Sequence, residues 1–208
     1  MKYIIMCGGT YNDWKTPRWL VKVNDEPLVE RTIRLLRENN VKDIAISSNH
    51  NCFDYLDVPI LRHDNDYVCG RATSKDAWIS AFYPSDEPTC YIFGDVLFSR
   101  NAIKTIVETD TDDIEFFASA PPFDKRYPKG HAEPFAFKAQ NIKHFLQCVK
   151  ETEMLYRGGK IKRCIAWELW QVIKHTKLNK IDYTNYVAIN DYTCDIDSTE
   201  DIYKWHIT

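Results

Sequence analysis

The sequence predicts a single-domain α/β fold in which helices cover both faces of a mostly parallel, mixed sheet. Short apolar segments of strand length alternate along the chain with longer segments of helical periodicity. The strand-like segments are apolar on both faces, as strands are when helices pack on both sides of a parallel sheet. The length of 208 residues fits one domain, and the sequence contains no internal repeat.

The predicted strands are short apolar runs that stop at glycine or at polar residues. The first occupies residues 2–7 and ends at Gly8-Gly9. Further strands are expected at residues 41–48, 58–62, 89–93, 114–120 and 134–139, and extended segments at 182–190 and 192–194.

The predicted helices show apolar residues at helical spacing. In residues 27–40, Leu28, Ile33, Leu35 and Leu36 form one face, while arginines and glutamates form the other. Further helices are expected at residues 73–82, 101–108, 141–153 and 164–175. In the last of these, Trp167 and Trp170 are expected in the core, because aromatic residues three apart on a helix are more often packed than exposed for stacking.

Composition and charge exclude several classes of protein. The apolar content of 44% and the charged content of 27% are those of a globular protein. A net charge of −3 argues against binding to nucleic acid or to an anionic membrane surface. No apolar run approaches the roughly 20 residues of a membrane span, and the first apolar run is too short for a signal peptide. The seven cysteines contain no C-x-x-C pair, which indicates reduced thiols, so a cytoplasmic protein is expected.

Three predicted strands end in residues that suit a nucleotide. In open parallel sheets, ligands bind at the carboxyl ends of the strands. Gly8-Gly9 could present backbone N–H groups to phosphates, and Gly94-Asp95 and Asp195-Ile196-Asp197 follow two other strands. Carboxylates from separate strand ends are what Mg²⁺ needs when it bridges a triphosphate. For each segment alone, a turn or a helix cap remains the alternative interpretation.

Taken together, these motifs resemble a known family. Residues 8–10 and 17–28 resemble the opening of the GT-A-like nucleotidyltransferases, which include sugar-phosphate nucleotidylyltransferases, cytidylyltransferases and molybdenum-cofactor guanylyltransferases. Residues 91–98 resemble their metal-binding strand, and residues 195–202 their C-terminal Asp-Ile-Asp stretch. The resemblance implies a Rossmann-like GT-A-type fold. Within it, residues 1–120 would bind nucleotide, and residues 121–208 would bind the acceptor and supply C-terminal metal ligands.

The resemblance also implies a reaction and a set of residues. The reaction is Mg²⁺-dependent transfer of a nucleoside monophosphate from a nucleoside triphosphate to a small phosphorylated acceptor such as a sugar phosphate. CTP is slightly favoured, because residues 70–74 resemble the base-reading segment of cytidylyltransferases. Arg18, Asp95 and Asp197 would be catalytic, with Asp95 and Asp197 as metal ligands and Asp195 as the alternative ligand. The nucleotide-binding set comprises Cys7, Gly8, Gly9, Thr10, Arg18, Ser48, Asn49, Gly70, Thr73 and Ser74.

The acceptor is expected at the proline-rich loop of residues 121–131. Four basic residues of this loop suit a phosphorylated acceptor: Lys125, Arg126, Lys129 and His131. Glu133 is a candidate for binding the acceptor by resemblance. A solvated surface loop is the alternative, and a homodimer is compatible with the sequence.

The opening loop departs from the family pattern. A glycine and an arginine of the pattern are replaced by Tyr11 and Asp13, and the lysine of a Pro-Lys pair by Arg18. Lys15 or Lys22 could replace the missing charge. A non-catalytic nucleotide-binding relative therefore stays open. A GT-A glycosyltransferase that uses a nucleotide-sugar is the other alternative, but it would need an Asp-x-Asp motif after a central strand, which Gly94-Asp95-Val96 does not provide.

Overall fold

A computed structural model describes residues 1–8, 17–62, 81–122, 126, 129–197 and 201. Within them, the four α-helices are α1 (Leu28–Glu38), α3 (Arg100–Glu108), α4 (Ile142–Arg157) and α5 (Ala166–Ile173). The strands of the main sheet are β1 (Lys2–Met6), β4 (Ile44–Ser47), β5 (Ile60–Leu61), β6 (Thr89–Phe93), β8 (Ile114–Ser119), β9 (Glu133–Ala139) and β10 (Val187–Ala188). Smaller elements are β2 (Lys22–Val23), β3 (Glu26–Pro27), β7 (Val96–Leu97), β11 (Cys194–Asp195), η1 (Arg18–Leu20) and η2 (Asn51–Phe53).

The main sheet is mixed and mostly parallel, as predicted. Its seven strands run in the order β10-β8-β9-β6-β1-β4-β5. Neighbouring strands pair in parallel except at β9, which is antiparallel to both β6 and β8. The carboxyl ends of the parallel strands and the first residues of β9 therefore share one edge of the sheet. Both halves of the chain contribute strands to this sheet.

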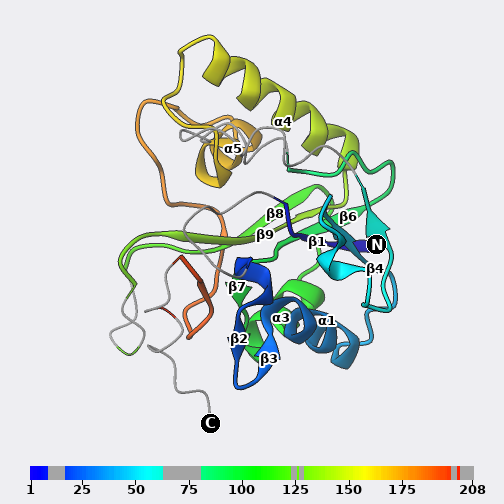
Figure 1. The fold of residues 1–208 in the computed structure, drawn as a ribbon. Coiled ribbons are helices and arrows are strands. Elements are labelled where there is room, and N and C mark those ends of the chain that lie inside the picture. The colour runs from blue at the N-terminus through cyan, green and yellow to red at the C-terminus, as the bar shows by residue number, and fades with distance from the viewer. Residues whose placement is uncertain (9–16, 63–80, 123–125, 127–128, 198–200, 202–208) are drawn as a thin grey trace.

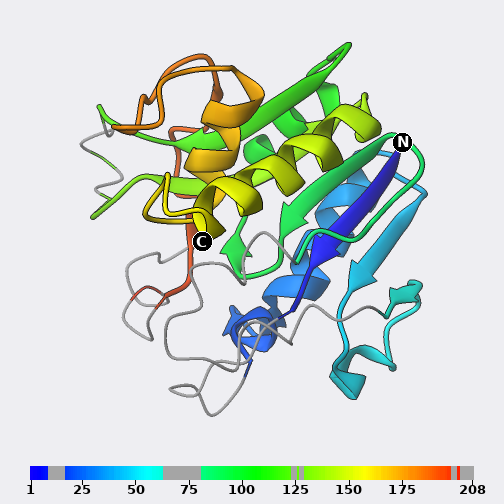
Figure 2. The same cartoon turned by 90° about the horizontal axis from the view of Figure 1, so that it is seen from above.

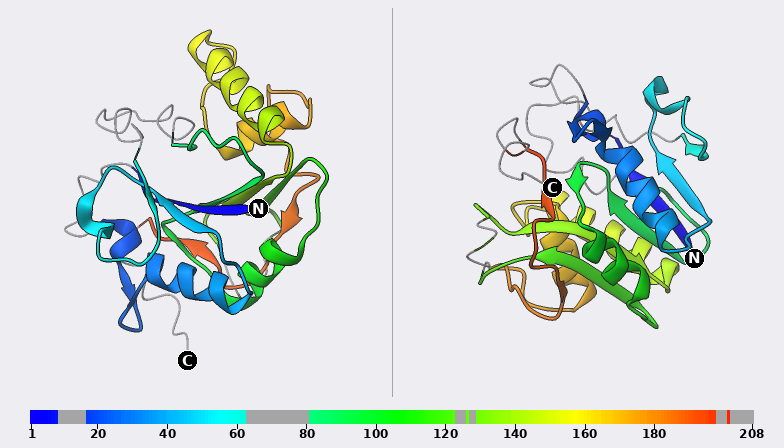
Figure 3. Two further views of the ribbon diagram at one scale, coloured as in Figure 1. Left: turned by 90° about the vertical axis from the view of Figure 1, so that its right-hand side faces the viewer. Right: turned by 90° about the horizontal axis from the view of Figure 1, so that it is seen from below.

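Helices cover both faces of the sheet. In Figure 1, α1 and α3 lie on one side and α4 and α5 on the other, and the view from a second side agrees (Figures 1 and 3). Seen from above, α4 and α5 lie side by side across the strands (Figure 2). Aromatic rings fill the interface beneath α5: Phe116 stacks on Phe137 at 4.5 Å between ring centres and meets Trp167 edge-on at 4.9 Å. Trp167 and Trp170 are buried, which confirms their prediction as core residues.

Helix α1 packs through its predicted apolar face, with one departure. Leu28, Ile33, Leu35 and Leu36 are all buried, but so is Arg31, which was expected on the polar face. The Arg31 guanidinium donates to the carbonyl oxygen of Phe98 at 3.1 Å and to the Tyr192 hydroxyl at 3.4 Å. A buried arginine is tolerated where such acceptors replace water. Arg31 thus ties α1 to two segments that lie far away in the sequence.

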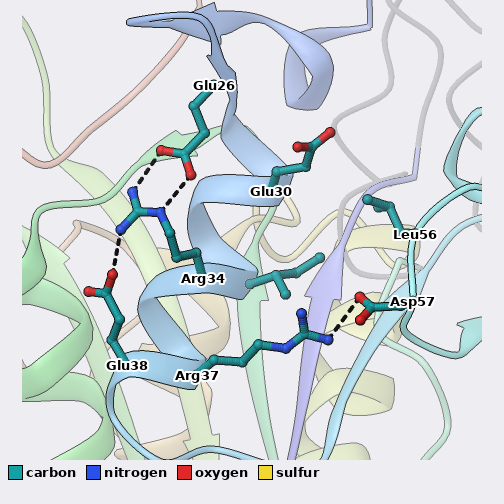
Figure 4. Close-up of a pocket in the computed structure, with 8 residues that line it drawn as sticks. Glu26, Glu30, Arg34, Arg37, Glu38, Leu56 and Asp57 are labelled. Carbon is teal, nitrogen blue, oxygen red and sulfur yellow. Dashed lines mark hydrogen bonds and ion pairs between the residues drawn. The ribbon is translucent and has the colours of Figure 1, made fainter.

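The outer face of α1 carries an ion-pair network that lines a shallow hollow beside residues 56 and 57 (Figure 4). Arg34 makes a two-pronged contact with Glu26, with both distances at 2.7 Å, and also reaches Glu38 at 2.7 Å. Arg37 pairs with Asp57 at 2.9 Å. Such exposed pairs contribute little each, although the fork of Arg34 fixes β3 against α1.

The structure places the ends of several elements differently from the prediction. The expected extended segment 182–190 is a strand only at β10, and the hairpin of β2 and β3 was not predicted. Its turn residues Asn24 and Asp25 have φ of 52° and 64°, the left-handed pair that a tight hairpin needs. The predicted helix at 73–82 lies almost entirely outside the described residues. All six described cysteines are free thiols, and no helix in the described residues is long and apolar enough to cross a membrane.

Lys138 is a buried residue of β9 that binds the end of α3. Its buried ammonium group donates to the carbonyl oxygens of Ile106, Val107 and Thr109, at 3.1, 2.9 and 2.6 Å. These carbonyls end α3, where no further turn of helix can pair them. Burial lowers the pKa of Lys138, because it disfavours the charged ammonium. The three carbonyl acceptors offset part of this cost.

We expect Lys138→Met to lower the free energy of unfolding by about 2 kcal/mol, because charged hydrogen bonds to buried groups are lost while the side-chain volume is kept. Urea denaturation followed by circular dichroism measures the change. Lys143→Met, on the exposed face of α4, is the matched control and should be nearly neutral. Equal stability of the two variants would contradict this role for Lys138.

Candidate active site

The site forms where β1 and β6 end side by side. The Cys7 N–H donates to Ser47 O at 2.9 Å, and the Gly94 N–H donates to Met6 O at 3.0 Å, so the chain stays paired to the last residues of these strands. A Cβ atom on Gly94 would lie 2.5 Å from both Met6 O and Cys7 Sγ. The absence of a side chain at Gly94 therefore lets Asp95 emerge beside Cys7, directly before the glycine loop that begins at Gly8.

A small second sheet brings the C-terminal aspartates to the same place. Strands β7 and β11 pair antiparallel, with Asp195 opposite Val96, and the Ile196 N–H donates to Asp95 O at 2.9 Å. Ile196 is buried in a small apolar cluster that includes Leu28. Asp195 and Asp197, on either side of Ile196, remain at the site.

Arg18 faces these aspartates from the opening segment. It begins the short helix η1, directly after Pro17. Its Nη1 atom donates to Asp197 Oδ1 and lies 3.9 Å from Asp95 Oδ2. The structure thus brings together all three residues that the sequence predicted as catalytic.

The start of β9 completes the cluster. His131 Nε2 lies 3.8 Å from Asp195 Oδ2 and 3.7 Å from Asp197 Oδ2. Glu133 is buried and pairs with Lys129 at 3.0 Å between Nζ and Oε2. The predicted acceptor residues His131 and Glu133 therefore adjoin the predicted metal ligands.

Crowding of carboxylates shifts their proton affinities. Burial raises the pKa of Asp95 to about 6; the Asp195 charge adds to this effect, and Arg18 opposes it. Burial and then Asp195 also raise the pKa of Asp197. Pairing with Asp195 raises the pKa of His131 to about 9, and burial followed by the Asp195 charge raises that of Glu133.

These shifts fit a divalent cation. Asp95, Glu133, Asp195 and Asp197 supply four acidic groups, and Arg18, Lys129 and His131 supply the positive groups beside them. The raised pKa values of Asp95 and Asp197 mean that the nearby positive groups do not fully offset the burial and mutual repulsion of the carboxylates. A bound Mg²⁺ would supply the missing charge, and carboxylate oxygens are its preferred protein ligands.

The segment that leads into β11 is anchored to the start of α3. Ser99 Oγ donates to Asp191 Oδ2 at 2.6 Å and accepts from the Ala102 N–H at 2.8 Å as the helix cap. The Ser99 N–H donates to Thr193 Oγ1 at 3.0 Å, and the Thr193 N–H donates to Asp191 Oδ1 at 2.8 Å. This network fixes the chain just before Asp195. Sequence reasoning missed it, because it joins residues more than 90 positions apart.

The remaining predicted site residues divide into two groups. Ser48 is buried, and its hydroxyl accepts from the His50 N–H at 3.1 Å; Asn49 beside it is partly exposed. Arg126 is exposed in a turn, and Lys22 is exposed on β2. Nucleotide and acceptor roles for these residues stay predictions. The predicted residues that lie outside the described part of the chain are Gly9, Thr10, Tyr11, Asp13, Lys15, Gly70, Thr73, Ser74 and Lys125.

Comparison with known proteins identifies the fold. No protein-family model matches the sequence, and no curated protein sequence matches it either. A structure from Bacillus anthracis, described as a glucose-1-phosphate thymidylyltransferase in complex with a sucrose, matches with a TM-score of 0.60 and 16% identity, over 98% of this chain and 92% of that one. The chain thus has the fold of a nucleotidyltransferase, and the predicted resemblance is confirmed at the level of the fold.

Two further structures match over nearly their whole length. The CTP:phosphocholine cytidylyltransferase LicC from Streptococcus pneumoniae has a TM-score of 0.56 and 17% identity, and HddC from Yersinia pseudotuberculosis, complexed with GMP-PN, has 0.54 and 13%. Each alignment covers 98% of this chain and 96% of the other. The likeness extends over nearly the full length of both chains in each pair and shows the fold.

The raised pKa of Asp95 predicts how metal and pH act together. Between pH 3.8, the ordinary pKa of an aspartate side chain, and about pH 6, Asp95 binds a proton in the folded protein and releases it in the unfolded chain. Without metal, this difference lowers the free energy of unfolding as pH rises through that window. A Mg²⁺ ion bound at Asp95 would compete with the proton for the carboxylate. We expect Mg²⁺ to raise the melting temperature more at about pH 8 than at about pH 5. Differential scanning fluorimetry measures both shifts, and equal shifts would contradict metal binding at Asp95.

Proposed function

We propose that the protein is a Mg²⁺-dependent nucleotidyltransferase. It would transfer a nucleoside monophosphate from a nucleoside triphosphate to a small phosphorylated acceptor, with release of pyrophosphate. The observation that carries the proposal is the convergence of Arg18, Asp95, Asp195 and Asp197 at the carboxyl edge of the sheet, beside the start of the glycine loop. The nucleotidyltransferase fold of the whole chain supports it.

The chemistry demands positioning and charge neutralisation. The acceptor phosphate attacks the α-phosphorus in line, and the bond from the α-phosphorus to the leaving pyrophosphate breaks. A phosphate oxygen is already anionic near neutral pH, so no side chain has to remove a proton from it. Mg²⁺, held by Asp95 and Asp197, would neutralise the phosphate oxygens.

The protein's own groups would perform the remaining work. The N–H groups of the glycine loop, from Gly8 to Thr10, would bind the phosphates of the triphosphate. Arg18 would offset the charge that develops between the α-phosphate and the leaving group. Arg18 donates a hydrogen bond to Asp197 in the structure, so its guanidinium lies beside a carboxylate that would hold the cation.

The acceptor would bind at the start of β9. His131 lies beside Asp195 and Asp197, and its raised pKa keeps it cationic near neutral pH, which suits an acceptor phosphate. The basic residues Lys125 and Arg126 of the same loop would add further charge. Glu133 is buried and paired with Lys129, so in this conformation it would hold Lys129 in place at the edge of the site.

Two experiments in sequence test the proposal. A thermal-shift screen with CTP, UTP, GTP, ATP and dTTP, each with Mg²⁺, identifies the nucleotide, and CTP is the first expectation. A pyrophosphate-release assay with that nucleotide and a panel of sugar phosphates, polyol phosphates and amino-alcohol phosphates then identifies the acceptor. Release of pyrophosphate that depends on one acceptor supports the proposal. Nucleotide binding without turnover across the panel would favour the non-catalytic relative instead.

A further inference from the structure

The Lys129 ammonium group lies inside the protein at the edge of the acidic cluster. Its side chain is 3% exposed. The ammonium donates to Glu133 Oε2 at 3.0 Å and to the carbonyl oxygen of Thr193, and it lies 4.9 Å from the centre of the Phe135 ring. A carboxylate, a carbonyl oxygen and an aromatic face together replace the water that a buried cation loses. This position is therefore built to hold a positive charge.

The same position borders a set of metal-binding groups. His131, Glu133 and Asp195 each offer one ligand atom, and these atoms all lie within 4.8 Å of one another. Once its imidazole has lost its proton to a binding metal, His131 would join the two carboxylates in a donor set that suits Mn²⁺ and similar divalent ions. On their own, these residues would form a cation site next to the one assigned to Asp95 and Asp197.

Glu133 belongs both to this donor set and to the ion pair with Lys129. A divalent ion bound to Glu133 would lie close to the buried ammonium, where repulsion between like charges is weakly screened. The ammonium is held by Glu133, the Thr193 carbonyl oxygen and the Phe135 ring, so it cannot move away without losing these contacts. The ammonium and a second metal ion would therefore exclude each other.

We propose that the Lys129 ammonium stands in for a second divalent cation, so that this site takes one metal ion. The inference rests on the proposed function for the first ion, which Asp95 and Asp197 would bind. It adds that the positive charge beside Glu133 belongs to the Lys129 ammonium group instead of a metal ion. Two-metal sites of other phosphoryl-transfer enzymes hold a second divalent ion close to the first, whereas this protein would use an ammonium group of its own beside the first ion.

Mn²⁺ binding to the metal-free protein, followed by the electron paramagnetic resonance signal of free Mn²⁺, gives the number of ions per chain. We expect one ion in the wild type and in Lys129→Arg, which keeps the charge. Lys129→Met removes the charge at similar volume and should bind two ions. The double variant Lys129→Met/Glu133→Gln should return to one. Lys160→Met, at an exposed position, controls for the loss of one positive charge and should bind one.

Two results would overturn the proposal. One is a wild type that binds two ions and loses one of them in Glu133→Gln. The other is a folded Lys129→Met protein, verified by circular dichroism and melting temperature, that binds no more Mn²⁺ than the wild type. If Lys129→Met does not fold, the wild type and Glu133→Gln decide: one ion in each supports the proposal.

Failure of the proposed function gives a different pattern. A wild type that binds no Mn²⁺ contradicts the metal assignment to Asp95 and Asp197. The inference is then tested by two variants. Lys129→Met should bind one ion, and the double variant Lys129→Met/Glu133→Gln should bind none. Gain of that ion supports a cation position occupied by Lys129, and no gain overturns it.

Discussion

Asp95→Asn is expected to lower kcat of the proposed nucleotidyl transfer by at least roughly 1,000-fold, because it removes the charge of the proposed metal ligand at the centre of the site. Burial of Asp95 already favours its neutral form, so the neutral asparagine should leave the metal-free protein as stable as the wild type or more stable. The backbone bond from the Ile196 N–H to the carbonyl of residue 95 does not depend on the side chain. The loss should therefore appear in catalysis and in Mg²⁺ binding without loss of fold.

The matched control is Asp43→Asn. Asp43 is exposed and lies just before β4, at the amino edge of the sheet, where its carbonyl accepts from the Tyr3 N–H. This variant should keep full activity. Steady-state pyrophosphate release and the Mg²⁺-dependent rise in melting temperature, measured side by side, separate the two variants. An Asp95→Asn protein with full metal-dependent turnover would show that the metal lies elsewhere.

Arg18→Met should lower kcat by about 100- to 1,000-fold, the usual effect of removing one preorganised group that stabilises transition-state charge. Arg18 is the described cation that contacts both Asp95 and Asp197, and its side chain is 18% exposed. The loss of positive charge should also raise the pKa values of the two aspartates further, so proton competition with Mg²⁺ should extend to higher pH.

Arg18→Lys tests whether charge alone is sufficient. A lysine keeps the charge without the planar fork, so partial activity between that of the wild type and Arg18→Met is expected. The control is Arg37→Met. Arg37 lies on α1 and forms an exposed ion pair with Asp57, so its loss should leave the protein active. Rates of Arg18→Met within a few fold of the wild type would remove Arg18 from the mechanism.

The fold was predictable because its signals are local. Apolar runs that end at glycine or polar residues located β1, β4, β6 and β8, and helical periodicity located α1 and α4. The burial of Arg31 was not predictable, since its acceptors Phe98 and Tyr192 lie 67 and 161 positions away. Neither spacing nor composition carries information of that kind.

The candidate site was predictable in part for the same reason. Gly94-Asp95 follows a strand of the main sheet, so its place at the carboxyl edge follows from the fold. Asp195 and Asp197 reach the same edge through the small sheet of β7 and β11, which was not predicted. The pairing of Lys129 with Glu133 and Thr193 was not predicted. It depends on how the loop before β9 folds against β11, and a basic loop in sequence looks the same whether its lysine is solvated or buried.

The fate of the α-phosphate tests the central proposal most directly. The protein is incubated with Mg²⁺, the acceptor found in the pyrophosphate screen, and nucleotide labelled either at the α- or at the γ-phosphate. Nucleotidyl transfer predicts that the α-label enters the acceptor product, that the γ-label appears as pyrophosphate, and that both transfers are lost in Asp95→Asn. An α-label that remains in free nucleotide while the γ-label leaves as phosphate, or no movement of label with any acceptor, would contradict the proposal.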